Sequence, residues 1–388
     1  MTTINLSKDQ KEVLSQIYNW TKKPTSPYIT LGGYAGVGKT TLMAEYRRLL
    51  NKKKKKFKVA FVSYTGRATR VLNSKLKTGQ AIFKQDKVST IHSLIYSPVL
   101  NSKQAIVGWK LKESLEFDLI VIDEASMVDQ HLWKDILSFN LPIVAVGDHG
   151  QLPPIKGNFN LMENPMVRLE KIHRQAQDNP IIKLSLLARE NGHIPIRQFG
   201  DKVIKIDKNS FDSKEQIENQ LQNYSPDTII LCGYNKTRTK LNQFIRRGLG
   251  FESQDPIAGD RVICLKNNHK KNIFNGMLGT IQFIKSKNQN WYQTEILMDD
   301  EADLFQGLIY KDQFGNKSSL NFTHNRSKHL RGDLFDFGYS LTVHKAQGSQ
   351  AKKVILFEER FPKMDDLIWK RWLYTAVTRA EQELFIVS

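Results

Sequence analysis

The chain has 388 residues, of which 25% are charged and 40% are hydrophobic, and this composition excludes a largely disordered protein. Lysine and arginine number 58 and aspartate and glutamate 39, so the formal net charge is +19, which favours a polyanionic partner such as nucleic acid or an acidic membrane surface. The sequence has no apolar run of about 18 residues, no secretory signal at its start and only two cysteines, which excludes a membrane-spanning helix and predicts a reducing compartment.

Strands and helices alternate along the chain. Helices are predicted after Lys39 and after Thr65, and short apolar strands at 28–31, 58–64, 118–123 and 142–147. The second half continues with strands predicted at 228–232, 261–265, 339–343, 353–357 and 384–387. This alternation predicts an α/β fold with parallel sheets and crossover helices, and the length favours two or three domains.

Three segments interrupt the alternation. Residues 93–117 predict a small insertion, and the polar residues 189–227 predict a linker between two lobes. Residues 283–337 have short alternating runs rich in Lys, Asn, Asp and aromatics, which predict an inserted small β-domain. Five consecutive lysines at 52–56 fit either a solvated helix end or a patch that contacts phosphates.

A glycine-rich loop follows the first predicted strand. Residues 33–40 (GYAGVGKT) match the phosphate-binding pattern G-x-x-x-x-G-K-[ST] between a strand and a helix. Glycines let backbone N–H groups approach phosphates, and the following helix N-terminus favours an anion. We predict that Lys39 contacts the β- and γ-phosphates and that Thr40 binds Mg²⁺. The predicted cradle comprises Gly33, Gly36, Gly38, Lys39, Thr40 and Thr41.

Two acids end the strand at 118–123 and complete the predicted site. Asp123 is expected to hold Mg²⁺, and Glu124 to orient and deprotonate the attacking water. An acid pair at a strand end is a weak signal alone. It becomes strong beside the glycine loop, because phosphoryl transfer needs a phosphate cradle together with a holder of metal and water.

Three further polar residues are candidates for the same chemistry. Gln151 follows an apolar strand and is expected to sense the γ-phosphate, with a plain Gly/Pro turn as the alternative. Arg174 and Arg379 are candidate arginine fingers, which stabilise charge in the transition state, although a single arginine is more often a surface residue.

The ordered motifs resemble those of superfamily 1 helicases, and within them the RecD-like class, most of all the Dda-type helicases of bacteriophages. The resemblance spans residues 10–387 and implies two RecA-like lobes with ATP bound in the cleft between them. Its most specific parts are 123–127 (DEASM), 147–154 (GDHGQLPP), 344–348 (HKAQG) and 376–379 (AVTR).

The resemblance assigns further roles around ATP. Gln10 matches a glutamine that reads adenine, but Ser7-x-x-Gln10 also fits a capping box, and both interpretations hold only if the side chain does not fold back. Arg174 and Arg379 match the arginines of two conserved helicase motifs. Tyr374 fits a motif position or a core aromatic.

Contacts with nucleic acid also follow from the resemblance. Thr65, His92, Thr342 and His344 are expected to contact the strand or to couple it to ATP, since short polar side chains can hold phosphates without reading bases. His92 and His344 could equally be structural histidines.

The two insertions correspond to known parts of this class. The resemblance implies that 93–117 is a β-hairpin pin that splits the duplex, with Tyr96 and Trp109 as candidate wedge aromatics. The alternative is that Trp109 anchors the hairpin. Residues 283–337 correspond to an SH3-like domain over the strand. The lobes are then 1–188 and 228–388.

The resulting hypothesis is an ATP-dependent DNA helicase that moves 5′ to 3′ on single-stranded DNA in the cytoplasm, which is the host's if the chain is viral. Its expected partners are ATP, Mg²⁺ and single-stranded or forked DNA, with a single-strand DNA-binding protein as a candidate, no membrane, and a monomeric state. The alternatives are an RNA-directed helicase of the same superfamily and a P-loop NTPase that remodels proteins. DNA replication, recombination and protein displacement remain open as pathways.

Overall fold

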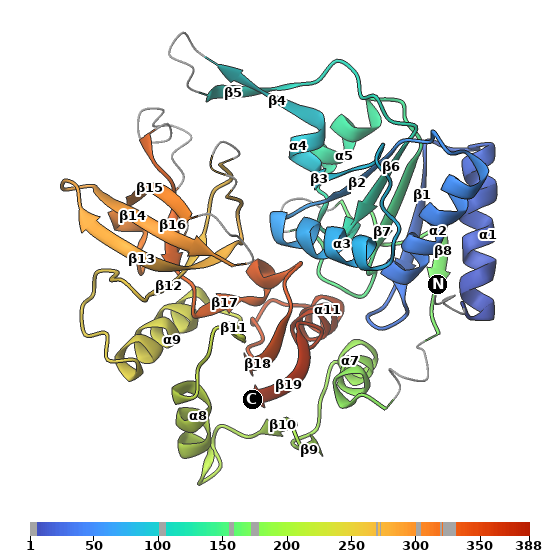
Figure 1. Cartoon of the computed structure of the whole chain (residues 1–388). Helices are drawn as coiled ribbons and strands as arrows, with labels where there is room; N and C mark the ends of the chain where they lie inside the picture. The colour runs from blue at the N-terminus through green and yellow to red at the C-terminus, as the bar shows by residue number, and fades with distance from the viewer. Residues whose placement is uncertain are drawn as a thin grey trace. The chain divides into compact units, whose positions relative to one another are not determined.

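The computed structural model describes residues 6–100, 106–154, 159–171, 178–268, 271, 273–299, 304–318, 320 and 331–388. The chain divides into two compact units, Met1–Ile182 and Lys183–Ser388, called here the first and second units (Figure 1). The sequence predicts this division at residue 188, a few residues farther along the chain. No helix among the described residues is long and apolar enough to cross a membrane.

The described part of the first unit contains one parallel sheet in the order β3-β2-β6-β7-β1-β8. The predicted strands of the first half are confirmed, whereas β3 and β8 have no counterpart in the prediction. Both are only three or four residues long, too short for a clear pattern. The strands are β1 (Tyr28–Gly33), β2 (Val59–Ser63), β3 (Lys87–Thr90), β6 (Leu119–Asp123), β7 (Ile143–Gly147) and β8 (Val167–Leu169).

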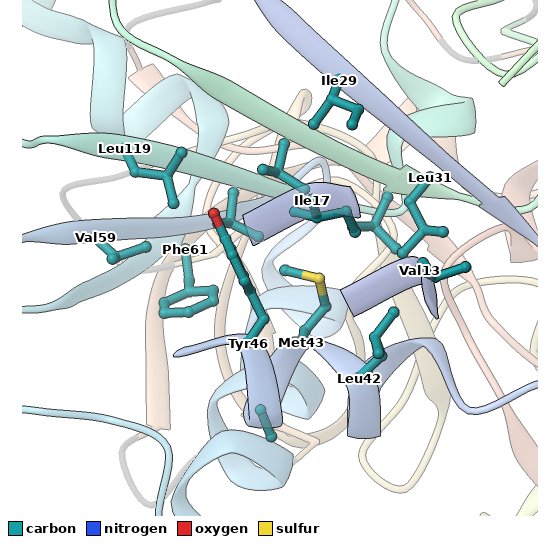
Figure 2. Packing of buried hydrophobic residues seen from close by; sticks show 14 of the residues in the cluster. Val13, Ile17, Ile29, Leu31, Leu42, Met43, Tyr46, Val59, Phe61 and Leu119 are labelled. Carbon is teal, nitrogen blue, oxygen red and sulfur yellow. The ribbon is translucent and has the colours of Figure 1, made fainter. Parts of the chain in front are cut away.

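Helices cover both faces of this sheet. Alternate residues of its central strands enter two different cores: Phe61 and Val121 pack with α1, α2 and α3, and Val62 and Ile122 pack with α4 and α5. Figure 2 shows the first of these cores, where Tyr46 lies near Phe61. The helices are α1 (Lys8–Lys22), α2 (Lys39–Lys53), α3 (Gly66–Thr78), α4 (Ile91–Ile95) and α5 (Gln130–Leu137). Two-sided coverage explains the nearly uninterrupted apolar strands.

The predicted insertion at 93–117 contains an antiparallel hairpin. Strand β4 (Tyr96–Leu100) pairs with β5 (Ile106–Leu111), and these two strands form a sheet of their own. In Figure 1 the hairpin extends away from the main sheet of the first unit. The expected hairpin is therefore present.

The second unit has a sheet in the order β17-β11-β18-β19-β10-β9, parallel except for the pair β9 and β10. Residues 189–227, predicted to be a linker, are instead part of this unit, because β10 pairs with β19 and α8 packs in its core. The strands are β9 (Arg197–Gly200), β10 (Val203–Ile206), β11 (Thr228–Cys232), β17 (Ser340–Thr342), β18 (Ala351–Phe357) and β19 (Ala380–Val387). The helices are α7 (Pro180–Asn191), α8 (Ser213–Gln222), α9 (Asn235–Gly248) and α11 (Asp366–Val377).

A separate antiparallel sheet in the order β15-β14-β13-β12-β16 forms the small β-domain of the second unit. The predicted strand at 261–265 belongs to this sheet and not to the main one, so the insertion starts before residue 283. An apolar run does not show which sheet it joins. The strands are β12 (Arg261–Cys264), β13 (Leu278–Ser286), β14 (Trp291–Met298), β15 (Leu304–Tyr310) and β16 (Phe335–Phe337).

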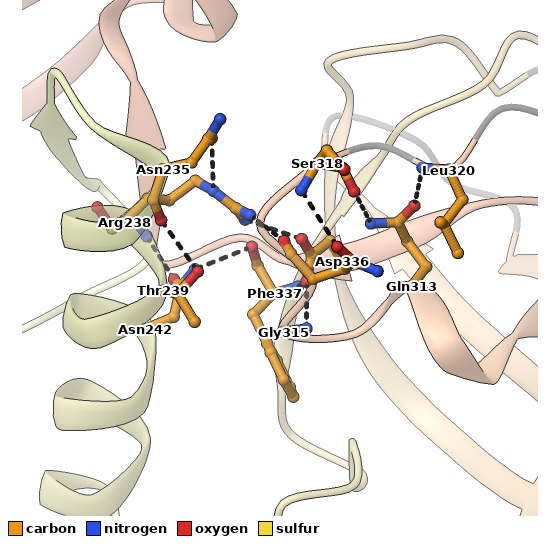
Figure 3. Close-up of polar contacts among 12 residues, drawn as sticks. Asn235, Arg238, Thr239, Asn242, Gln313, Gly315, Ser318, Leu320, Asp336 and Phe337 are labelled. Carbon is orange, nitrogen blue, oxygen red and sulfur yellow. Dashed lines mark hydrogen bonds and ion pairs between the residues drawn. The ribbon is translucent and has the colours of Figure 1, made fainter.

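Buried polar contacts join α9 to β16 (Figure 3). Arg238 donates to Asp336 Oδ2 at 2.8 Å and to the Asn316 carbonyl at 2.6 Å, and the side chains of the ion pair are only 2% and 1% exposed. Asn242 accepts from the Ser340 N–H at 2.8 Å. The helix of the main sheet is thereby fixed to the small β-domain through paired, buried charges.

Candidate nucleotide and nucleic-acid sites

The glycine-rich loop joins β1 to α2 in a conformation that requires glycine. Gly36 and Gly38 have φ angles of 81° and 82°, and Gly38 is the left-handed N-cap of α2. Because no side chain caps α2 and no acid lies in its first turn, its N-terminus suits an anion. Thr40 and Thr41 follow in the first turn, both half-buried. The predicted phosphate cradle thus has the expected backbone.

The ammonium group of Lys39 is held by the loop itself. Lys39 Nζ donates to the Gly33 carbonyl at 2.6 Å and to the Tyr34 carbonyl at 3.0 Å. Asp148 Oδ2 lies 3.9 Å from the same nitrogen. The positive charge is therefore already positioned over the cradle, with oxygen partners that phosphate oxygens can replace.

Asp123 and Glu124 lie at the carboxyl end of β6, two strand positions from the loop after β1. Burial and the charge of Glu124 raise the pKa of Asp123, while Lys39 opposes the increase. A cation beside Asp123 would lower this pKa and stabilise the charged carboxylate. Glu124 has φ 54° and ψ 41°, an uncommon left-handed conformation for a residue with a side chain, and such strain is concentrated at functional sites.

The segment after β7 brings further polar groups to the loop. The His149 ring lies 4.1 Å from the Tyr34 ring, and Asp148 Oδ1 accepts from the Gly150 N–H at 2.9 Å. Gln151 is 5% exposed, and its Oε1 has no hydrogen-bond partner among the described residues. Phosphate oxygens accept hydrogen bonds, so the amide N–H groups of Gln151 would have to make a γ-phosphate contact, while the unpaired Oε1 can accept from a donor such as water.

Asp148 and two buried hydroxyls near the site were not predicted from the sequence. Ser126 follows the acid pair, and Ser63 is paired in register with Asp123. In the described part of the chain neither hydroxyl oxygen has a hydrogen-bond partner. Asp148 could have been predicted, because it is the acid in the motif GDHG at 147–150. A lone serine gives no sequence signal for a functional site.

These residues fit a nucleotide with Mg²⁺. The described residues contain no cluster of three or more His, Cys, Asp or Glu side chains able to bind a metal ion. Mg²⁺ commonly uses one or two carboxylates, water and substrate phosphates, so Asp123 with Thr40 is a sufficient protein contribution.

Gln10 forms the capping box with Ser7, which is the alternative to an adenine contact. Its Oε1 accepts from the Ser7 N–H at 3.1 Å, and the Ser7 hydroxyl caps the helix in return. Its Nε2 donates to the Val37 carbonyl at 3.1 Å, within the glycine-rich loop. The side chain therefore does fold back, and reading adenine would require it to exchange partners; the adenine contact stays a prediction.

Of the two candidate arginine fingers, only Arg379 lies among the residues that the structure describes. Arg174 lies outside the described residues. Arg379 is 3% exposed and donates to the carbonyls of Thr375 and Ser349 at 3.0 and 3.1 Å. In the second unit Arg379 therefore ties the end of α11 to the loop before β18. Tyr374 is fully buried, as expected of a core aromatic.

The first-unit candidates for nucleic acid separate into structural and exposed residues. The Thr65 hydroxyl caps α3 by accepting from the Ala68 N–H at 3.2 Å. His92 is half-buried, and burial lowers its pKa. The Tyr96 hydroxyl donates to Asp135, so Tyr96 anchors the hairpin, while Trp109 is 44% exposed on β5. Trp109 is thus the better placed of the two wedge candidates.

The second-unit candidates lie where β17 ends. Thr342 is 8% exposed, and His344 is half-buried with a pKa lowered by burial. Lys345 beside them was not predicted from the sequence. Burial, together with the charge of Arg238, lowers the pKa of Lys345 to about 8. The HKAQG run was the available signal for Lys345.

Family models match two parts of the chain. The model described as an AAA domain matches residues 5–203, and that of the UvrD-like helicase C-terminal domain matches residues 337–387. The ATP-dependent RecD2 DNA helicase of Deinococcus radiodurans is 26% identical over 98% of this chain but only 48% of its own length. The ATP-dependent DNA helicase Pif1 of Campylobacter jejuni is 25% identical over 91% of this chain and 86% of that protein.

Solved structures share the fold. Pif1 helicase from Bacteroides in complex with ADP-AlF₃ and ssDNA gives a TM-score of 0.56 at 18% identity, covering 100% of this chain and 93% of that one. A structure of two coordinating Pif1 helicases at forked dsDNA gives a TM-score of 0.55 at 18% identity, covering 99% of this chain and 92% of that one. The α/β fold expected from the sequence is confirmed.

Proposed function

The chain belongs to the superfamily 1 helicases of the RecD and Pif1 type, and we propose that it hydrolyses ATP to move 5′ to 3′ along single-stranded DNA and to separate the duplex ahead of it. The chain spans about half the length of the RecD2 relative, so its activity is inferred from its own residues. The closer likeness to Dda-type helicases remains a prediction.

One observation carries the proposal: Lys39, Asp123, Glu124 and Asp148 converge at the carboxyl edge of the first-unit sheet. Lys39 of the loop lowers the pKa of Asp123, and its Nζ lies 3.9 Å from Asp148 Oδ2. Both interactions link the loop to the strand ends. Phosphoryl transfer depends mostly on positioning and electrostatics, which this arrangement supplies.

Each residue then has a defined task. Lys39 exchanges its two carbonyl partners for β- and γ-phosphate oxygens, while Thr40 and Asp123 hold Mg²⁺. Bound Mg²⁺ supplies charge neutralisation on those phosphates. Glu124 accepts the proton of the attacking water, and Gln151 donates an amide N–H to the γ-phosphate. Arg174 and Arg379 are proposed to stabilise the transition-state charge.

The substrate proposal rests on charge and on the hairpin. A formal net charge of +19 favours a phosphate backbone, and exposed Trp109 on the hairpin can stack on a base. Thr65, His92, Thr342 and His344 are proposed strand or coupling residues. We propose forked and single-stranded DNA as substrates, a monomer as the active state, and a single-strand DNA-binding protein as a partner.

Tailed duplexes test the proposal. Unwinding of a duplex with a 5′ single-stranded tail is expected, with little unwinding of the matching 3′-tailed duplex. Preference for the 3′ tail would overturn the polarity. ATP hydrolysis should rise more with single-stranded DNA than with RNA of equal length, and indifference to both would favour a protein-remodelling NTPase.

A further inference from the structure

A second pocket of the first unit lies beside β3, the edge strand of the sheet. Its volume is about 320 Å³, and β3 lies four strand positions from β1, which precedes the glycine-rich loop. At the usual strand spacing that is about 19 Å across the sheet. The pocket is therefore separate from the nucleotide site. It is lined by Lys58, Gln85, Lys87, Leu94, Lys112, Ser114, Leu115, Glu116 and Phe117.

Three lysines and one acid give the pocket an excess of positive charge. Lys58, Lys87 and Lys112 form no ion pair with any carboxylate that the structure describes, and Glu116 is the one acid of the lining. Lys112 Nζ donates to the carbonyls of Ser93 and Leu94, at 3.2 and 2.6 Å. Its position is thus fixed, and Lys112 and Lys87 are close enough to repel each other.

More positive charge adjoins the pocket. The Gln85 side chain, which lines it, donates to the Lys55 carbonyl at 2.9 Å, within the lysine run 52–56. The five lysines of that run are exposed. The ATP and DNA sites use none of these residues, so the lysine run gains a place beside an anion-attracting pocket.

Leu94, Leu115 and Phe117 are the apolar residues of the lining. Leu94 is 1% exposed, and Leu115 and Phe117 pack partly against the core behind them. A phosphate backbone needs no apolar lining, so phosphates alone would leave the partly exposed Leu115 and Phe117 without a partner. An acidic peptide that also carries apolar side chains uses both kinds of surface.

We propose that this pocket binds an acidic peptide segment of a partner protein, with one apolar side chain seated on Leu115 and Phe117 and its carboxylates paired with Lys58, Lys87 and Lys112. The proposal does not rest on helicase activity. Its test uses peptide binding in the absence of ATP and DNA, so it can fail or succeed independently of the proposed function.

The probe is a fluorescein-labelled peptide, Asp-Asp-Phe-Asp-Asp-Leu-Asp-Asp, with fluorescence anisotropy as the readout on the full chain. The first comparison is the same peptide with Ser in place of Phe and Leu. The variant Lys58→Glu/Lys87→Glu changes two exposed side chains of the pocket. Its matched control, Lys11→Glu/Lys23→Glu, makes the same charge change at exposed positions on and just after α1.

We expect the pocket variant to weaken binding by about tenfold or more at roughly 0.15 M salt, and the control variant to change it far less. The Ser peptide should bind more weakly than the Phe/Leu peptide. Equal losses in both variants, or equal binding of both peptides, would overturn the proposal. A larger loss of oligo(dT) binding in the pocket variant than in the control would assign the pocket to nucleic acid instead. Circular dichroism of each variant distinguishes lost contacts from unfolding.

Discussion

Glu124 combines a chemical role with an unusual backbone. Its left-handed conformation aims a carboxylate from the end of β6, and Gln fits the same backbone about as well. Glu124→Gln should therefore lower ATP turnover by about 10²–10⁴-fold, the usual worth of a general base, while ATP and DNA binding persist. Steady-state hydrolysis and filter binding measure the two effects. Near-normal turnover would remove Glu124 from the role of base.

Gln10 belongs both to the cap of α1 and to the glycine-rich loop. Ser7→Ala and Gln10→Ala should each lower the free energy of unfolding by about 1 kcal/mol, because each breaks the capping box. Only Gln10→Ala is expected to reduce the preference for ATP over GTP in kcat/KM. Urea unfolding and nucleotide-dependent rates give the two readouts. Retained preference in both variants would leave Gln10 with the capping role alone.

The hairpin is the element whose two aromatics have separable roles. Trp109→Ala should slow unwinding by about 5- to 150-fold, corresponding to a stacking contribution of about 1–3 kcal/mol per base, with ATP hydrolysis on single-stranded DNA unchanged. Tyr96→Phe removes only the bond to Asp135 and serves as the companion variant. Normal unwinding by Trp109→Ala, measured on forked DNA, would contradict a wedge role.

Helix α9 depends on a buried ion pair with β16. Removing one partner, as in Asp336→Asn or Arg238→Met, should destabilise the second unit by about 3–5 kcal/mol, because the remaining charge stays buried. The double variant Arg238→Met/Asp336→Asn removes both charges and should cost less than the sum of the two single changes. Chemical denaturation of the four proteins measures this difference, and additive losses would show that the pair is not coupled.

How much of these elements the sequence predicts depends on the kind of signal. Long apolar strands such as β11 are predicted to the residue, since two-sided burial leaves an unbroken run. The edge strand β3 and the short β10 are missed. The strand at 261–265 is assigned to the wrong sheet, because pairing partners are distant in sequence. Motif spacing gives the P-loop and acid pair, whereas the bonds of Gln10 and the anchoring by Tyr96 depend on packing.

The charge of the whole molecule sets how binding responds to salt. If DNA is held mainly through phosphates, log Kd should rise linearly with log salt concentration, by about 0.7 for each phosphate neutralised on a single strand. Titrations of oligo(dT) at several salt concentrations measure the slope. An affinity independent of salt would contradict the argument from the +19 charge.

Both cysteines of the molecule are buried and unpaired. Burial raises the pKa of the Cys232 thiol to about 12 and also raises that of Cys264. Both thiols are thus protonated and unreactive at neutral pH, which agrees with a fold that needs no disulfide.

Strand order also determines when each unit can fold during translation. The first-unit sheet is complete once β8 (Val167–Leu169) has been synthesised, whereas β10 waits for β19 (Ala380–Val387), which lies between β10 and β18. At about 5–20 residues per second, the ribosome needs roughly 10–40 s to make the intervening chain. The first unit can therefore form on the ribosome while β10 still lacks its partner β19.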